Sequence, residues 1–263
     1  MQKSRLLRER LLLCLSRKPD VNENKIVSDD LDMDSALSQL SKSLPRFPAL
    51  INDKEILDFG CGTGYQSVAL ARMGAKHVVG VDINKTFLAV AQKLAAQVGV
   101  ANKVDFKQHV DDSLERRFDI VISQNSMEHF SDPAGALATM KGALKDHGVI
   151  LITFGPPWFA PFGSHMHFFV KMPWVNIFFD ERTIMSVRRE FKHDGATRFE
   201  DVEGGLNKMT VKKFETLIRE SHLQVEYERY QCIKGVDLIA KLPILRELFI
   251  NQISVIVSRS PSS

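Results

Sequence analysis

The chain has 263 residues, 44% of them hydrophobic, which is enough for one α/β domain with a full core plus an appendage but not for two equal domains. Its 35 basic and 32 acidic residues give a net charge of +3, a balance that argues against nucleic acid as a partner. The three cysteines, Cys14, Cys61 and Cys232, lie far apart without C-x-x-C spacing. They indicate neither a disulfide framework nor a zinc site, and the cytoplasm is the expected compartment.

The first eighteen residues combine leucines with basic side chains. The uninterrupted apolar run, Leu11 to Leu15, is too short for a signal-peptide core, and no small-residue cleavage site follows. The pattern predicts a solvated or peripheral amphipathic helix; attachment to a membrane surface is the alternative, since a basic amphipathic helix can lie on anionic lipid. The basic residues are Lys3, Arg5, Arg8, Arg10, Arg17 and Lys18.

A second helix is predicted where leucines recur at spacings of three and four residues, which places them on one helix face. These leucines are Leu37, Leu40 and Leu44. Pro45 and Pro48 then break the chain before the first strand. We expect residues 1–52 to form an N-terminal helical extension that packs on, or covers, the main domain.

The most informative segment is a buried strand, 55–59, that runs into the turn Gly60-Cys61-Gly62-Thr63-Gly64. The glycines let the backbone turn tightly and let a ligand lie against bare main chain, while the following helix N-terminus offers N–H groups. A second strand, 77–82, ends at Asp82, whose carboxylate is placed to accept both hydroxyls of a ribose. The pattern indicates a nucleoside-cofactor site.

The glycine spacing distinguishes between two classes of protein that have such a loop. A dinucleotide-binding dehydrogenase uses G-x-G-x-x-G because a pyrophosphate sits on the helix N-terminus. Here Gly64 comes one residue early. Asp58, two residues before Gly60, would repel a pyrophosphate but attract an ammonium or a sulfonium. The loop therefore favours a cationic ligand.

The segment 56–64 consists of an apolar strand, an acid, one further residue and then G-x-G-x-G. In this motif the chain resembles the class I S-adenosyl-L-methionine (SAM)-dependent methyltransferases. The resemblance covers residues 56–154 strongly and the last two strands weakly. It implies SAM as the cofactor, with Asp58 and the glycine loop holding the amino acid portion and Asp82 the ribose. It also implies that the closing strands form an antiparallel hairpin.

From residue 54 the predicted strands and helices alternate, which implies parallel strands with helices on both faces. The strands are 55–59, 77–82, 103–108, 118–123, 148–154, 224–233 and 252–258, and the helices are 65–73, 85–98, 133–145 and 210–221. We expect a Rossmann-like, doubly wound, mostly parallel seven-stranded sheet with an antiparallel last strand. Beyond the extension, the expected units are a SAM-binding core (53–155), an aromatic substrate or lid insertion (156–208) and a C-terminal completion of the sheet (209–263).

Two adjacent acids, Asp111 and Asp112, follow the third strand, where the family commonly has an acid that meets the adenine. Either acid fits this role, and the alternative for the second is a helix cap. The resemblance also assigns Ile83, directly after Asp82, to the adenine.

The fourth strand releases the chain into Gln124-Asn125-Ser126-Met127-Glu128-His129. Ligands in open α/β sheets bind beyond the carboxyl ends of the strands, so Gln124 and Asn125 are expected at the cofactor and the segment should face its methyl group. Many small-molecule methyltransferases end this segment in Glu-His, which Glu128-His129 matches. His129 is a candidate general base for an attacking hydroxyl; the alternative is that it only hydrogen-bonds the loop.

The ubiquinone-biosynthetic O-methyltransferases resemble this chain through the same Glu-His. They place a further Glu three residues earlier and bind a divalent metal there, whereas this chain has Asn125. One carboxylate and one imidazole make a poor site for a hard cation, so we expect no metal.

Nine of the chain's 22 aromatic residues, including both tryptophans, fall between Phe154 and Phe179. This density predicts a pocket wall or lid for an apolar or planar acceptor; a second small core and a docking surface for a membrane or partner are the alternatives. On an extended strand, His165 and His167 would place both rings on one side. We expect a substrate-facing base there, alternative or additional to His129, rather than a metal pair.

The resemblance therefore implies a methyltransferase for a small-molecule, lipid-linked or sugar acceptor, with a hydroxyl favoured because His129 offers a base. One alternative is a non-catalytic SAM-fold protein with a binding or scaffolding role. Another is a protein or nucleic-acid methyltransferase, which would need an open, charged groove. The segment after the fourth strand also lacks the Asn-Pro-Pro-Tyr type of loop found in base-flipping enzymes.

Overall fold

The computed structural model describes residues 7–17, 33–44, 47–235, 237–243 and 245–260. Their strands form one sheet in the order β3-β2-β1-β4-β5-β7-β6. Strands β1 to β5 run parallel, whereas β7 runs antiparallel to both neighbours, so the expected fold is confirmed. The strands are β1 (Glu55–Phe59), β2 (His77–Val81), β3 (Val104–Lys107), β4 (Phe118–Gln124), β5 (Leu144–Phe154), β6 (Leu223–Cys232) and β7 (Ile250–Arg259).

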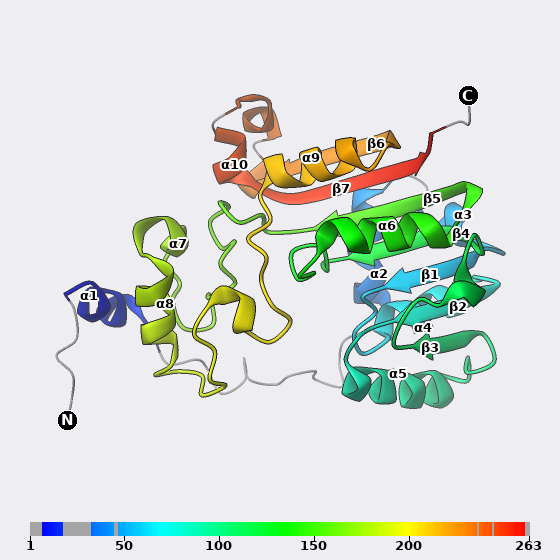
Figure 1. Cartoon of the computed structure of the whole chain (residues 1–263), viewed down its shortest axis with the longest axis horizontal. Helices are drawn as coiled ribbons and strands as arrows, with labels where there is room; N and C mark the ends of the chain where they lie inside the picture. The colour runs from blue at the N-terminus through cyan, green and yellow to red at the C-terminus, as the bar shows by residue number, and fades with distance from the viewer. Residues whose placement is uncertain (1–6, 18–32, 45–46, 236, 244, 261–263) are drawn as a thin grey trace.

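Helices cover both faces of this sheet (Figure 1). Successive residues of a strand point to opposite faces, and β4 shows the result: Ile120 and Ile122 are buried on one face and Val121 on the other. The first face is covered by α2 (Met33–Ser43), α3 (Phe47–Ile51) and α4 (Tyr65–Arg72), and α5 (Lys85–Val98) packs beside α4 and β3. The second face is covered by α6 (Pro133–Ala143) and α9 (Val211–Glu220).

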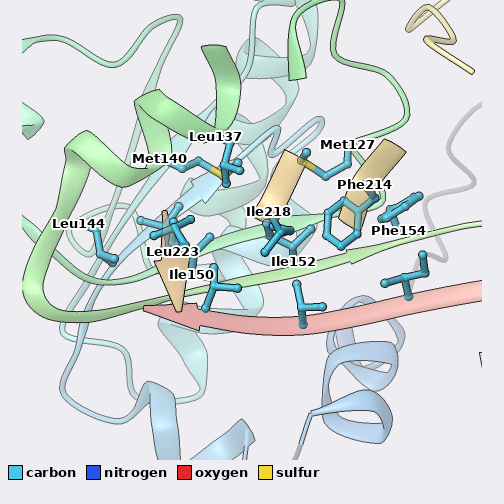
Figure 2. Close-up of a cluster of buried hydrophobic side chains, with 14 of the residues drawn as sticks. Met127, Leu137, Met140, Leu144, Ile150, Ile152, Phe154, Phe214, Ile218 and Leu223 are labelled. Atoms are coloured by element: carbon cyan, nitrogen blue, oxygen red, sulfur yellow. The ribbon is translucent and has the colours of Figure 1, made fainter. Parts of the chain in front are cut away.

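The core on the second face joins segments that are distant in the sequence (Figure 2). Phe154, at the end of β5, meets Phe214 of α9 with ring centroids 4.8 Å apart. Met127, which follows β4, is fully buried in the same cluster. The cluster thus anchors the loop that leaves β4 to the sheet beneath it.

The N-terminal extension divides between two parts of the molecule. Leu37, Leu40 and Leu44 are buried against the sheet, so the predicted helix face is confirmed. Pro48 does not break the chain as expected, because it lies in the first turn of α3, where its missing N–H costs no hydrogen bond. Helix α1 (Leu7–Leu15) instead packs on α8 (Glu181–Arg188). The expectation that the whole extension packs on the main domain is therefore wrong for α1.

The segment between β5 and α9 folds as a lobe with its own hydrophobic core, at the left of Figure 1. Leu12 of α1 is fully buried in this core, and Arg17 N–H donates to Phe169 O over 2.8 Å. Of the three interpretations of the aromatic segment, the small core holds for four of its nine aromatic side chains, namely Trp158, Phe168, Phe169 and Phe179. The buried members from the lobe include Met166, Phe169, Val170, Val175, Phe179, Ile184, Met185, Phe199 and Leu206.

Some features of the lobe lie outside the sequence predictions. Helices α7 (Val175–Phe178), α8 and, near the C-terminus, α10 (Leu245–Phe249) were not expected. Three aromatic side chains stay exposed, namely Phe159, Phe162 and Phe178. Lys3, Arg5 and Lys18 lie outside the described residues. Within the described part of the chain, no helix has the length and apolar character to cross a membrane.

Truncating the buried Phe214 tests whether α9 is held by the second-face core. We expect Phe214→Ala to lower the free energy of unfolding by about 3–5 kcal/mol, because the substitution leaves a cavity against Phe154. Phe178→Ala is the control, since that side chain is 63% exposed and its loss should change stability by less than about 0.5 kcal/mol. Urea unfolding followed by circular dichroism measures both, and equal effects of the two variants would contradict the packing described.

Candidate functional site

The glycine loop between β1 and α4 is docked on the end of β2. The N–H groups of Gly60 and Cys61 both donate to Val81 O, over 2.8 and 3.0 Å. A Cβ at Gly60 would lie 2.6 Å from Ser126 Oγ, and one at Gly64 would lie 2.5 Å from Ala91 Cβ. Glycine at these two positions therefore lets the loop after β4 and helix α5 approach closely.

Gly62 differs from its two neighbours because a Cβ there would meet no atom within 4 Å. Its side of the loop is open, and its N–H donates to Asp82 Oδ2 over 2.9 Å. The other oxygen of Asp82 accepts from Asn84 N–H at 2.8 Å. The half-buried carboxylate is thus fixed in one orientation, and each oxygen keeps a second lone pair for a ligand.

Ile83 follows Asp82 and is 80% exposed, an unusual state for a large aliphatic side chain. It lies next to the carboxylate that faces the loop, so the structure brings Gly62, Asp82 and Ile83 to one open rim. This rim lies beyond the carboxyl ends of β1 and β2, where the sequence predicted it.

Two other residues of the loop region, Asp58 and Cys61, are buried. Asp58 is 1% exposed and accepts from Gln66 Nε2 and Ser67 Oγ, both at 2.6 Å. Burial raises its pKa to about 6. Asp58 therefore connects β1 to α4 through these two hydrogen bonds, and its carboxylate does not point to the open side of the glycine loop. Cys61 is buried, and this burial is the main reason why the pKa of its thiol is raised. Thr63 is half-buried.

The two acids after β3 have different surroundings. Asp111 accepts from Lys107 Nζ at 2.7 Å and caps a short 3₁₀ turn through Ser113 N–H. Hydrogen bonds, first that from Lys107, lower its pKa to about 2. Asp112 is exposed. The cap that the sequence offered as an alternative for the second acid is therefore made by the first.

The loop after β4 meets the N-terminal extension. Gln39 of α2 accepts from Gln124 Nε2 at 3.2 Å and from Asn125 Nδ2 at 3.1 Å. Ser126 packs on Gly60, so this loop and the glycine loop are adjacent. Sequence reasoning missed Gln39, because nothing in the pattern of α2 distinguishes this residue from an ordinary polar position.

Glu128 and His129 occupy different environments. Glu128 is 4% exposed, burial raises its pKa, and its Oε2 has no hydrogen-bond partner. His129 is half-buried, and its Nδ1 lies 2.7 Å from Gly205 O. A carbonyl oxygen only accepts, so in the neutral ring Nδ1 carries the hydrogen and Nε2 keeps a lone pair.

A segment of the lobe holds this loop in place. Asn207 N–H donates to Glu128 O at 2.9 Å, and Asn207 Nδ2 donates to Met127 O and Phe130 O at 2.7 and 2.8 Å. Gly205 supplies the carbonyl that fixes the tautomer of His129. No motif or period in the sequence predicts the contacts of Asn207, although Gly204-Gly205 is a turn signal.

The two histidines of the lobe are separated. His165 meets His129 with ring centroids 5.5 Å apart, whereas His167 is exposed. The expected extended strand is absent in this described segment, which consists of turns, so the two rings do not share a strand face. Chiefly because it is buried, the pKa of His165 is lowered to about 4. Among the described residues, no group of three or more His, Cys, Asp and Glu side chains is arranged to hold a metal ion.

Residues 51–155 match a family model described as a methyltransferase domain. Over these residues the chain carries a methyltransferase domain. It is similar to the ubiquinone biosynthesis O-methyltransferases of Actinobacillus pleuropneumoniae (33% identity over 108 residues, 38% of this chain and 45% of that protein) and Pseudomonas aeruginosa (34% over 104 residues, 38% and 44%). The chain therefore spans less than half the length of these curated relatives.

Solved structures agree with this methyltransferase domain over a longer part of the chain. A SAM-dependent methyltransferase from Mesorhizobium loti covers 88% of this chain and 100% of its own, with a TM-score of 0.54 at 19% identity. A geranyl diphosphate methyltransferase in complex with SAM covers 88% of this chain and 86% of its own, with the same TM-score at 13% identity. At these identities the likeness shows the fold alone.

The buried Asp58 predicts a pH-dependent stability. Its pKa is raised from 3.8 to about 6 in the folded chain, so the folded state holds the proton more tightly. The free energy of unfolding should then fall as pH rises from 4 to 6, by about 1–3 kcal/mol, and stay level above that range. Asp58→Asn should lack this step, because an amide does not titrate.

Urea unfolding at pH values from 4 to 8 measures the step as the difference between wild type and Asp58→Asn. Asp112→Asn is the control, since its carboxylate is exposed. A difference between wild type and Asp58→Asn that stays constant over this pH range would contradict the assignment.

Proposed function

We propose that this chain is a SAM-dependent methyltransferase that transfers a methyl group to a hydroxyl of a small-molecule, lipid-linked or sugar acceptor. The observation that carries the proposal is the position of Asp82. Its carboxylate is held at 2.9 Å by Gly62 N–H on the open side of the glycine loop. A ribose diol placed there would donate to the remaining lone pairs.

The residues at the rim fit the remaining parts of SAM. The open space beside Gly62 leaves room for the ligand against main chain, and exposed Ile83 offers an apolar surface for a flat adenine. Asp112, whose carboxyl group is exposed, is the better candidate for the adenine amino group, because Asp111 is engaged by Lys107 and Ser113. Asp58 would act through the loop that it positions.

When bound, SAM supplies an electrophilic methyl carbon next to a positively charged sulfur. The acceptor oxygen would form a bond to that carbon as the carbon–sulfur bond breaks and its electron pair returns to sulfur. The chain's main contribution would be to hold the two groups in line and exclude water. Gln124 and Asn125, which hydrogen-bond Gln39, would border this place.

His129 is proposed as the group that takes the hydroxyl proton. The support is the hydrogen bond from Nδ1 to Gly205 O, which leaves Nε2 as the acceptor in the neutral ring. Asn207 hydrogen-bonds the main chain on both sides of His129, so the backbone that carries the ring is held in place. Buried Glu128 is the preceding residue, and as a carboxylate it would stabilise the positive charge of the ring once the ring has taken the proton.

Contact with a membrane surface is a further proposal of lesser scope. Leu7, Leu11 and Leu15 recur every four residues along α1 and are 82%, 55% and 45% exposed, which supports an apolar stripe on one side of the helix.

The proposed compartment is the cytoplasm, supported by the three cysteines, which are all thiols.

The role of Asp82 is tested by calorimetric titration with S-adenosylhomocysteine, the product of the transfer. We expect Asp82→Ala to weaken binding by about 10- to 100-fold, because the ribose hydroxyls lose their charged acceptor. Asp105→Ala removes an exposed carboxylate from the neighbouring strand β3 and should leave the affinity unchanged. Absence of binding by the wild type would overturn the proposed function itself.

The role of His129 is tested with labelled SAM and an acceptor found by screening hydroxylated metabolites. His129→Ala should lower kcat by about 10²- to 10⁴-fold, the usual contribution of a general base, with the affinity for S-adenosylhomocysteine preserved. His147→Ala is the control, because His147 is exposed near the start of β5, at the end of the parallel strands opposite to the glycine loop. Full turnover by His129→Ala would show that another group, or water, takes the proton.

A further inference from the structure

A trough of about 600 Å³ lies beside α9, where this helix meets the lobe. One of its walls consists of residues spaced by three and four along the helix, namely Lys213, Thr216, Leu217 and Glu220. Such spacing places them on one side of α9, which the trough therefore follows. Among the described residues that line it, none belongs to the glycine loop, to its rim or to the loop around His129. The trough is a different place from the proposed methyltransferase site.

The lobe contributes an aromatic wall to this trough. Trp158 and Phe159 line it, and Phe159 is 39% exposed. The hydrophobic cores of the lobe and of the second face, as far as the structure describes them, do not include Phe159. The wall is held by two hydrogen bonds of 2.7 Å, from Trp158 N–H to Met209 O and from Asn176 Nδ2 to Trp158 O. Phe159 and Leu217 therefore offer a preformed apolar surface to a ligand.

The first turn of α9 brings two positive charges to the same trough. The helix begins at Val211, and Lys212 and Lys213, its second and third residues, are both exposed. The N-terminus of a helix carries the positive end of its dipole, so lysines are unfavourable there and acids are favourable. No residue of this turn is acidic. The two lysines therefore weaken α9, and an anion bound beside them would offset that repulsion.

The partners of these lysines leave their charges available to a ligand. The carboxylate of Glu247 accepts from the N–H groups of Val211 and Lys212, over 3.1 and 2.8 Å, so it satisfies main-chain groups of the turn and offsets part of the positive charge. Lys213 Nζ donates to a neutral carbonyl, Lys208 O, at 3.3 Å. Within the described residues, neither Lys212 nor Lys213 forms an ion pair through its side chain.

The other charged groups of the lining set the direction of a ligand. Lys208 is paired with Glu181 at 2.9 Å and adds little net charge. Glu220 follows Lys213 by seven residues, which places it about 10 Å further along the helix at 1.5 Å per residue. The trough is thus basic where α9 begins and acidic at its other end. An anionic group is attracted to the first end and repelled from the second.

We propose that this trough is a second ligand site, and that it binds a small compound with a flat apolar body and one anionic group. The apolar body lies against Phe159 and Leu217, and the anionic group lies at Lys212 and Lys213. The inference does not rest on the proposed function, because the trough and the site at the glycine loop share no lining residue.

The test titrates three probes into the full chain by calorimetry at neutral pH. Naphthalene-2-sulfonate has both the flat body and the charge, naphthalene-2-sulfonamide lacks the charge, and methanesulfonate lacks the flat body. We expect the first to bind at least about tenfold more tightly than either of the others, because each of them loses one of the two contacts. Equal affinities, or no binding of naphthalene-2-sulfonate, would overturn the proposal.

Substitutions in the trough assign the contacts. The double variant Lys212→Gln/Lys213→Gln should weaken naphthalene-2-sulfonate binding at least about tenfold and leave the sulfonamide unchanged. Phe159→Ala removes an exposed ring and should weaken both at least about threefold. Lys93→Gln is the control, since it removes an exposed lysine of α5 and should change none of the affinities. Unchanged binding of naphthalene-2-sulfonate by the double variant would place the probe elsewhere and overturn the proposal.

Thermal unfolding without ligand separates a binding role of the lysines from a structural one. Because both lysines oppose the helix dipole, the double variant should unfold at the same temperature as the wild type or at a higher one. A lower temperature would show that the lysines stabilise the fold, which contradicts the argument for a ligand.

A competition experiment separates this site from the cofactor site. Saturating S-adenosylhomocysteine should leave the affinity for naphthalene-2-sulfonate unchanged, whereas competition would place the probe at the glycine loop and overturn the proposal. If S-adenosylhomocysteine does not bind, the proposed function fails, and the probe series with its variants still decides the present inference.

Discussion

The site depends on how the glycine loop is seated on the end of β2. Two N–H groups donate to one carbonyl, Val81 O, and a third donates to the carboxylate of Asp82 directly after that strand. These bonds turn the loop so that one glycine faces open space while its neighbours are packed against the loop after β4 and against α5. A shift of this loop would move the carboxylate, the rim and the neighbouring loop together, because all are in direct contact.

Where sequence reasoning succeeded, a local pattern had one structural outcome. Buried strands with glycine between them, and helices with clear caps such as Asn84 before α5, left little freedom, and α5 has the predicted bounds Lys85–Val98. The position of the rim at Gly62, Asp82 and Ile83 followed for the same reason, since each residue ends a predicted strand, directly follows one or lies in the turn after one.

Where sequence reasoning fell short, the deciding contact joined distant parts of the chain. Gln39 reaches Gln124 and Asn125 across more than eighty residues, and Asn207 reaches the loop around His129 across a similar separation. Such partners share no period or motif, so no pattern within either segment could identify them. Asp58 shows a second cause: a carboxylate in a glycine motif can turn inward to hydrogen-bond a helix, and sequence spacing does not fix that direction.

The attachment of α1 to the lobe has a consequence for the order of assembly. Leu12 is buried among residues that follow it by more than 150 positions, and Arg8 lies 3.5 Å from Asp180. During synthesis from the N-terminus, α1 emerges from the ribosome long before its docking surface exists, and a nine-residue helix is marginal by itself in water. The first helix of the sequence is thus among the last to reach its native contacts, and its apolar side chains remain available to chaperones until the lobe has been translated.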